Sequence, residues 1–153
     1  MRDQGKVLHF GVSNFTTSQL DMLASFFPIE ANQIEISPIQ LSSFLDGTLD
    51  QCIKNGILPM AYATLAKGKF FATSPEERIV RINKVVEKLS TIYNASADQI
   101  LVAWLLKHPS GILPIMGSTK INRIQSAVDS LSIQLTHEEW FMIWEASKGE
   151  RVP

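Results

Sequence analysis

Residues 31–38 have the sequence ANQIEISP, which has the length of a β-strand but an unusual number of polar side chains. We expect a strand over 31–36, because it is a short run with two isoleucines that ends before Ser37 and Pro38. Its Asn32, Gln33 and Glu35 are atypical of a strand buried in a core. Polar side chains at a strand end favour a ligand site there, and three more strands in this chain end the same way.

Outward from this stretch, short apolar runs alternate with helical patterns. We expect the other strands over 7–13, 57–63 and 111–116, and helices over 16–26, 47–55, 74–93, 97–107, 121–130 and from 136 onward. Thr16 or Thr17, Ser74, Ser96 and Thr136 are the expected helix caps, and Gly56 the expected left-handed helix end. Alternating strands and helices predict parallel pairing through right-handed crossovers, in a single domain over 1–153.

Four strand–helix units permit two architectures. One is an open doubly wound sheet, and the other is half of an eight-stranded barrel; periodicity alone does not choose between them. No glycine-rich turn of the dinucleotide-binding type joins a strand to a helix. A full barrel takes about 250 residues, and this chain has 153.

Composition excludes several functional classes. The chain is 45% hydrophobic with a net charge of −1, so we expect a folded protein and neither nucleic acid nor membrane as partner. The one cysteine, Cys52, fits a reducing compartment and is expected to be a buried structural thiol. The N-terminal residues lack the apolar region of a signal peptide, so we expect a cytoplasmic protein. The three histidines and Cys52 are too dispersed for a zinc site.

The other strand ends carry equally distinctive sequences, namely GVSNF over 11–15, MAYATL over 60–65 and LPIMGST over 113–119, followed by Arg123. Together with 31–38, and in this order, they resemble strands five to eight of the aldo-keto reductases. Residues 9–15 and 46–51 are most similar to bacterial oxidoreductases of that family. The resemblance implies an α/β fold, a partial (β/α)8 TIM barrel made of its C-terminal half with four parallel strands and surrounding helices.

The resemblance also implies a groove for NADP (NADPH). Tyr62 would stack on the nicotinamide ring, and backbone amides of 63–65 would lie along the pyrophosphate. The side chains of Ser13, Asn14 and Gln33 would bond to the nicotinamide carboxamide. The loop over 117–119 and Arg123 would hold the adenosine end, where Arg123 would contact a 2′-phosphate. The expected cofactor-binding residues are Ser13, Asn14, Gln33, Tyr62, Ala63, Thr64, Leu65, Gly117, Ser118, Thr119 and Arg123.

Three departures from the family pattern affect this groove. Many relatives have lysine where this chain has Gly117, which removes one phosphate-binding charge. They often have Ser-Pro in place of Ala63-Thr64, and a Glu-Asn pair in place of Ser126-Ala127. The last difference reduces the expected contacts to adenine.

The catalytic tyrosine, aspartate, lysine and histidine of the family lie on its first four strands, which have no counterpart in this sequence. We therefore assign no catalytic residue. The expected function is an NADP-dependent oxidoreductase of aldehydes or ketones, represented by its cofactor-binding half and inactive alone, with a carbonyl substrate once the other half is supplied. The alternative is a non-catalytic half-barrel that self-associates through exposed strand edges or pairs with a separate N-terminal half. A third interpretation is an unrelated phosphate-binding barrel that uses Gly117 and Ser118.

Several site residues also have simpler explanations. Asn14 is compatible with an Asx turn, and Tyr62 with a core aromatic. Arg123 is compatible with a surface ion pair to Asp129 or Glu87, and Gln33 with a solvated sheet edge.

Overall fold

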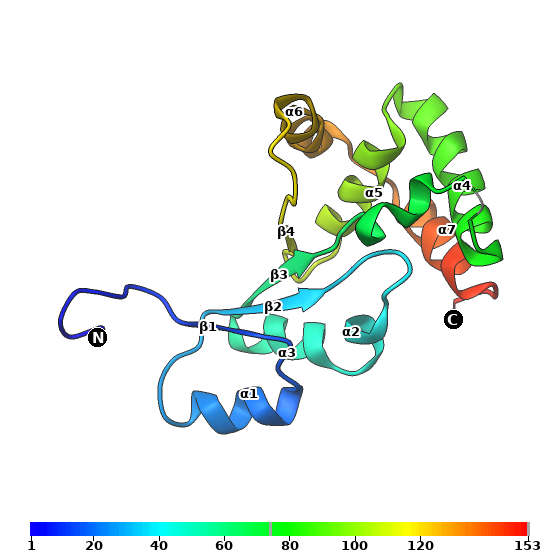
Figure 1. Cartoon of the computed structure of the whole chain (residues 1–153). Helices are drawn as coiled ribbons and strands as arrows, with labels where there is room; N and C mark the ends of the chain where they lie inside the picture. Colours follow the sequence, from blue (N-terminus) through cyan, green and yellow to red (C-terminus); the bar gives the residue numbers. More distant parts are fainter. Residues whose placement is uncertain (74, 153) are drawn as a thin grey trace.

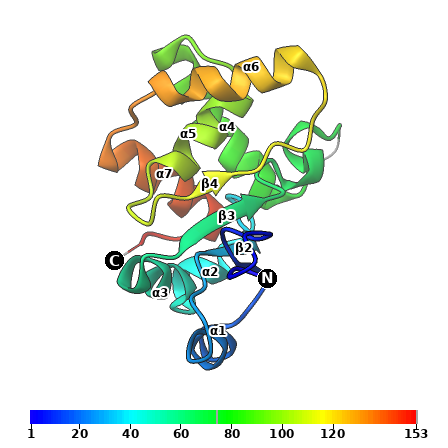
Figure 2. The same ribbon diagram turned by 90° about the vertical axis from the view of Figure 1, so that its left-hand side faces the viewer.

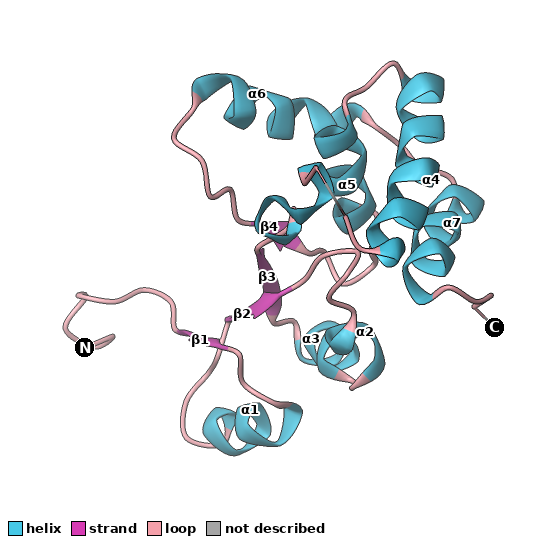
Figure 3. Ribbon diagram, turned by 45° about the vertical axis from the view of Figure 1, so that its right-hand side comes forward, coloured by secondary structure: helices cyan, strands magenta, loops and turns pink. Residues whose placement is uncertain are grey.

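The strands form one parallel sheet whose order follows the chain. A computed structural model describes residues 1–73 and 75–152, with strands β1 (Gly11–Ser13), β2 (Ala31–Glu35), β3 (Leu58–Tyr62) and β4 (Leu113–Pro114). All pair in parallel in the order β1-β2-β3-β4 (Figure 3). A doubly wound sheet reverses its strand order at a switch point, whereas successive barrel strands add on the same side. The observed order therefore selects the half-barrel.

The helices divide into two groups around this sheet. Figures 1 and 2 show the first three helices beside β1–β3 and the last four gathered over the β3–β4 side. The α-helices are α1 (Thr17–Ala24), α2 (Ser42–Leu45), α3 (Thr48–Asn55), α4 (Glu77–Tyr93), α5 (Ala97–Leu106), α6 (Ile121–Asp129) and α7 (His137–Lys148), with 3-10 segments η1 (Ala66–Phe71) and η2 (Ser130–Ser132). No helix in the described part of the chain is long and apolar enough to span a membrane.

The predicted helix ends are largely confirmed. Thr16, Ser96 and Thr136 each form a capping box with the residue three positions later. Gly56 closes α3 in the left-handed conformation, with φ of 64°. Helix α4 begins later than expected, at Glu77 with Glu76 as its cap, and the proposed cap Ser74 lies outside the described residues.

The strands are shorter than predicted, because a strand extends only where a neighbour pairs with it. The expected strand over 7–13 is reduced to Gly11–Ser13, whose pairing with β2 begins at Gly11. The expected strand over 111–116 is reduced to Leu113–Pro114, the two residues that pair with β3. The short helix α2 was not predicted.

Alternation along β2 and β3 gives the sheet two different faces. Asn32, Ile34 and Ala61 are buried on the face that the helices cover. The opposite face carries Gln33, and the register aligns it with Ser13 on β1 and Met60 on β3. This second face is the inner face of the half-barrel. Its Leu58 and Leu113 keep 40% and 45% of their surface exposed.

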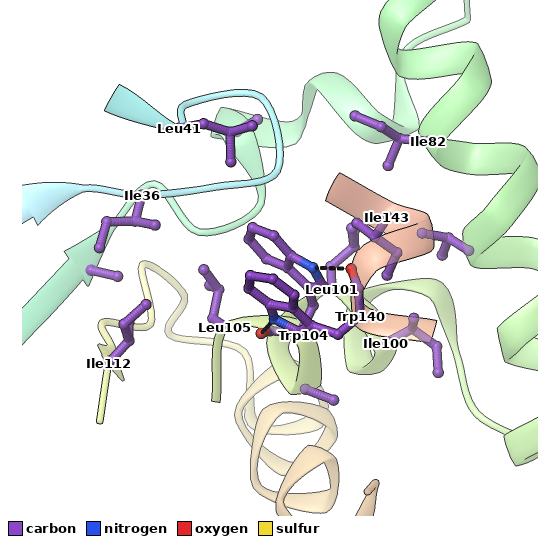
Figure 4. Close-up of a cluster of buried hydrophobic side chains, with 14 of the residues drawn as sticks. Ile36, Leu41, Ile82, Ile100, Leu101, Trp104, Leu105, Ile112, Trp140 and Ile143 are labelled. Carbon is purple, nitrogen blue, oxygen red and sulfur yellow. Dashed lines mark hydrogen bonds between the residues drawn. The ribbon is translucent and has the colours of Figure 1, made fainter. Parts of the chain in front are cut away.

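The main core lies between the sheet and helices α4, α5 and α7. Figure 4 shows the stacked indoles of Trp104 and Trp140, whose ring centroids are 5.3 Å apart. Each indole N–H donates to the other residue's backbone carbonyl, at 3.0 and 2.9 Å. A smaller cluster joins Leu20, Cys52 and Ile57. Burial raises the pKa of the Cys52 thiol to about 11, so the cysteine is the structural thiol that was expected.

Candidate functional site

A groove of about 950 Å³ opens at the carboxyl ends of β3 and β4. Ligands of parallel barrels bind at this end of the strands. Residues following β3 form one wall, the loop after β4 forms another, and α5 and α6 supply the third. Most of the predicted cofactor-binding residues line this groove, namely Tyr62, Ala63, Thr64, Leu65, Gly117, Ser118 and Arg123.

The polar residues at the ends of β1 and β2 meet Tyr62 beside the groove. The Tyr62 hydroxyl donates to the Asn14 side-chain oxygen at 3.3 Å. The Asn14 amide donates to Ser13 Oγ at 3.4 Å, and Ser13 Oγ donates to the Gln33 carbonyl at 3.1 Å. Tyr62 also lines a second, smaller cavity of about 220 Å³ together with Asn14 and Glu35. Three strands thus bring aromatic, amide and hydroxyl groups to one edge of the sheet.

Two of these residues hold a left-handed backbone, which non-glycine residues seldom adopt. Asn14 has φ of 55° and Ala63 has φ of 53°. The Asn14 carboxamide bonds to Tyr62 and Ser13 and so belongs to the strand-end cluster. Such conformations concentrate at functional sites, where surrounding contacts hold them.

The exposure and contacts of Tyr62 and Arg123 test two alternatives raised by the sequence: a core aromatic at Tyr62 and a surface ion pair at Arg123. Tyr62 is half-buried and lines the groove, so it is not a core aromatic. Arg123 is exposed on α6 and also lines the groove. Among residues 1–73 and 75–152, none of the ion pairs involves Arg123, so the pairing with Asp129 or Glu87 is not observed.

Four predicted residues lie outside the groove wall. Ser13, Asn14 and Gln33 are in the strand-end cluster beside Tyr62 instead. Thr119 follows Ser118 in the loop after β4, where its side chain is exposed.

The groove also contains residues that the sequence analysis missed. Lys67 lines it and lies 4.0 Å from Glu35, and Asn122 lines it beside Arg123. Asp98 lines it in the first turn of α5 and accepts a hydrogen bond from Ser126 Oγ at 2.7 Å. An acidic residue in a first helical turn is common for helix-dipole reasons, so its sequence position gave no signal of a site.

Asp98 is ionised in this environment. Burial acts to raise the pKa of its carboxyl group. Hydrogen bonds from Ser96, Ser126 and the backbone amides at the start of α5 outweigh burial and lower the pKa below its ordinary value. The groove wall therefore carries a fixed negative charge at Asp98 in addition to the positive charge of Arg123.

No group of three metal-ligating side chains occurs in the part of the chain that the structure describes. The three histidines are separate: His9 contacts Glu30, His108 bonds to Ser110, and His137 is exposed. The site thus offers an aromatic ring, amides, hydroxyls and cations, which are groups suited to an extended organic anion.

Comparison with known proteins identifies relatives over nearly the whole chain. The model of the aldo/keto reductase family matches residues 1–148. An oxidoreductase of Bacillus subtilis, YcsN, is 42% identical over 100% of this chain and 52% of its own length, and the Escherichia coli oxidoreductase YdhF is 40% identical over 100% and 51%. A Bombyx mori aldo-keto reductase solved in complex with NADP superposes with a TM-score of 0.75 at 31% identity, covering 98% of this chain and 48% of that one. The chain spans about half the length of these relatives.

Proposed function

This chain belongs to the aldo/keto reductase family, and from that premise we propose that it provides the NADPH-binding half of an oxidoreductase that reduces aldehydes or ketones. The observation that carries the proposal is the single groove lined by both Tyr62 and Arg123. A phosphate-binding barrel for small sugars has no need of a stacking ring, and the family match argues against it as well.

The nicotinamide end fits the cluster around Tyr62. A flat aromatic side chain that is half-buried offers one face for stacking. Ser13, Asn14 and Gln33 offer hydroxyl and amide groups at the adjoining strand ends, and a carboxamide needs both donors and acceptors. The bond from Tyr62 to Asn14 holds the ring and the amide in fixed relation, so the cluster is organised before a ligand arrives.

The phosphate end of the cofactor fits the two positively charged side chains that line the groove. Arg123 has a planar fork of N–H groups that matches a phosphate. Lys67 adds a second cation on the same groove. Helix α6 starts at Ile121, next to Ser118 and Arg123, so its free amides favour an anion there.

Bound NADPH would supply the hydride that reduces a carbonyl carbon. The residues of this chain bind and orient that cofactor: Tyr62 covers one ring face, and Asn14 limits rotation of the carboxamide. None of its residues is assigned the role of proton donor to the carbonyl oxygen. General acids typically contribute roughly 10² to 10⁴ in rate, so we expect the chain to bind NADPH and to turn over carbonyl compounds slowly or not at all by itself.

Titration of NADPH fluorescence tests this proposal. Arg123→Ala should weaken NADPH binding by about tenfold to one hundredfold, because a charge-assisted hydrogen bond contributes about 1.5–3 kcal/mol. Arg151→Ala is the matched control, since Arg151 is an exposed arginine outside the groove. Equal affinities for the two variants and the unmodified chain would remove the basis of the proposal.

A second candidate function is association without catalysis, which the open edges and inner face favour. Within the described residues, β1 and β4 each pair with one strand only, and Leu58 on β3 and Leu113 on β4 are exposed on the inner face. Open parallel edges and apolar inner faces normally need cover. We expect the chain to self-associate or to pair with a complementary half-barrel. A compact, stable monomer in light scattering at micromolar concentration would contradict this second candidate.

A further inference from the structure

Helix α6 presents an exposed apolar face. Four apolar side chains at helical spacing on α6 and η2 form this face, which we call the α6 stripe, and each keeps between 41% and 84% of its surface exposed: Ile121, Ile124, Val128 and Leu131. The groove residues Arg123 and Ser126 lie on the other side of the helix. In the described parts of the chain, the main contacts of α6 are with α5 and η2, and none is with a strand. The apolar face of a helix normally packs on a core, so the α6 stripe lacks a strand beneath it.

The opposite edge of the sheet lacks a covering helix. Val12 of β1 packs on the cluster of Leu20 on the outer face of the sheet. Alternation places Phe10 and Leu8 on the same side of the segment that precedes β1. Leu8 is exposed, and this segment extends away from the helices (Figure 1). Within the described residues β1 pairs only with β2, so its second edge is open.

The two edge strands are also the two strands that are markedly shorter than the sequence predicts. The patterns predicted strands over 7–13 and 111–116, whereas β1 and β4 cover only Gly11–Ser13 and Leu113–Pro114. The inner strands β2 and β3 differ from their predicted ranges by no more than one residue at either end. A strand extends where a neighbour pairs with it, so a missing neighbour at each edge accounts for both differences.

The surface of the chain is large for its mass. The chain exposes 9141 Å² of solvent-accessible surface at a mass of 17.1 kDa. A compact monomeric protein of this mass exposes about 7,750 Å², so the excess is about 1,400 Å². A stable protein interface buries about 800 Å² on each partner. The excess is therefore sufficient for one such interface.

We propose that these surfaces bind a second copy of the chain, so that two half-barrels close into one eight-stranded barrel about a two-fold axis. Strand β4 of each copy pairs with β1 of the other, and the α6 stripe of each copy covers Leu8 and Phe10 of the other. Pro114 has no N–H, so at this position β4 offers its carbonyl to the ladder. Each copy supplies what the other lacks, and the closed barrel leaves no open strand edge.

This inference rests on the second candidate function, association without catalysis, and names the partner and the contact. Sedimentation velocity of the whole chain over the micromolar range should show a species of two copies. Val128→Lys places an ammonium group in the apolar contact twice per dimer, so the dissociation constant should rise at least about tenfold. Val80→Lys is the matched control, because Val80 is exposed on α4, away from the α6 stripe.

Hydrogen exchange gives a second readout at the strand edge. The amides over 7–10 should gain protection as the protein concentration rises, and Val128→Lys should not show this gain. A two-copy species that Val128→Lys loses and Val80→Lys keeps, together with protection over 7–10, supports the proposal.

Three results would overturn it. Growth beyond two copies contradicts a closed barrel but leaves association in place. A dimer that Val128→Lys does not weaken, or that leaves 7–10 unprotected, has its contact elsewhere. A monomer at every concentration contradicts self-association altogether and leaves a complementary half-barrel as the occupant. NADPH titration measures the groove separately, so failure of the cofactor proposal is distinguishable from failure of this one.

Discussion

Replacing Gly117 by lysine should raise the affinity of the groove for NADPH more than for NADH. Gly117 lines the groove in the loop after β4. A Cβ at this position meets no atom within 4 Å, and the backbone has no positive φ that would oppose a side chain. A lysine should therefore be accommodated without rearrangement and can extend its ammonium group along the wall that carries Arg123.

The size of the effect follows from the added charge. Two unit charges 4 Å apart attract by about 1 kcal/mol in water and by about 4 kcal/mol near a protein surface. Restricting a flexible lysine side chain costs about 1.5–2 kcal/mol when it is fully ordered. A net gain of about 1 kcal/mol remains for a phosphate beside an exposed groove, which is about a fivefold increase in affinity.

Titrations with NADPH and NADH at two salt concentrations measure this effect. Gly117→Gln is the matched control, because it adds a side chain of similar reach without the charge. The gain for NADPH should shrink at high salt, where the Debye length is short. An equal gain for NADH, or a glutamine variant that matches the lysine variant, would show that the 2′-phosphate does not lie near Gly117.

Two further predictions concern stability. Burial lowers the pKa of His108 below its ordinary value of 6.5, with Asp50 acting in the opposite direction, so the unfolded chain binds more protons there and stability should fall as pH drops below about 6.5. Urea unfolding at pH 7 and pH 5 should show a smaller loss for His108→Gln than for the unmodified chain, and parallel losses would contradict the assignment. Trp104→Phe should destabilise the fold by about 2–4 kcal/mol, because it leaves a gap in the core and removes the indole N–H that donates to the Trp140 carbonyl. Trp144→Phe is the comparison, since the buried Trp144 indole N–H has no hydrogen-bond partner among residues 1–73 and 75–152. A thermal melt showing equal losses for both variants would refute the role given to the hydrogen bond.

The sequence indicated the elements whose signals are local. The capping boxes at Thr16, Ser96 and Thr136 depend on residues three positions apart, and all three were recognisable. Strand lengths depend on pairing partners distant in the chain, which is why β1 and β4 were overpredicted. Periodicity alone left the open sheet and the half-barrel both possible; the family resemblance predicted the half-barrel, and the observed strand order confirms it.

The site residues likewise divide into those that sequence motifs indicate and those that depend on contacts between distant parts of the chain. Tyr62, Gly117 and Arg123 were predicted from the family resemblance, and the structure brings them to one groove. Asp98 was missed because its sequence context is that of an ordinary helix start, and its hydrogen bond to Ser126 depends on the approach of α6. A groove residue whose position depends on contact between two helices leaves no periodic or spacing signal in either one.

Under the proposed function, cofactor binding and proton donation are separable along the chain. The Tyr62 ring, the amides and the cations of the proposed site lie between Ser13 and Ser126, on consecutive strand–helix units of one continuous segment. Their relative positions are fixed by contacts within that segment, such as the Tyr62–Asn14 and Ser126–Asp98 hydrogen bonds. We therefore expect this chain to bind NADPH, and the NADPH affinity of a variant is the measurement that tests a groove residue. Turnover needs, in addition, a proton donor to the carbonyl oxygen, which none of these contacts positions. A variant that loses NADPH affinity thus identifies a groove residue even where no reaction is observed.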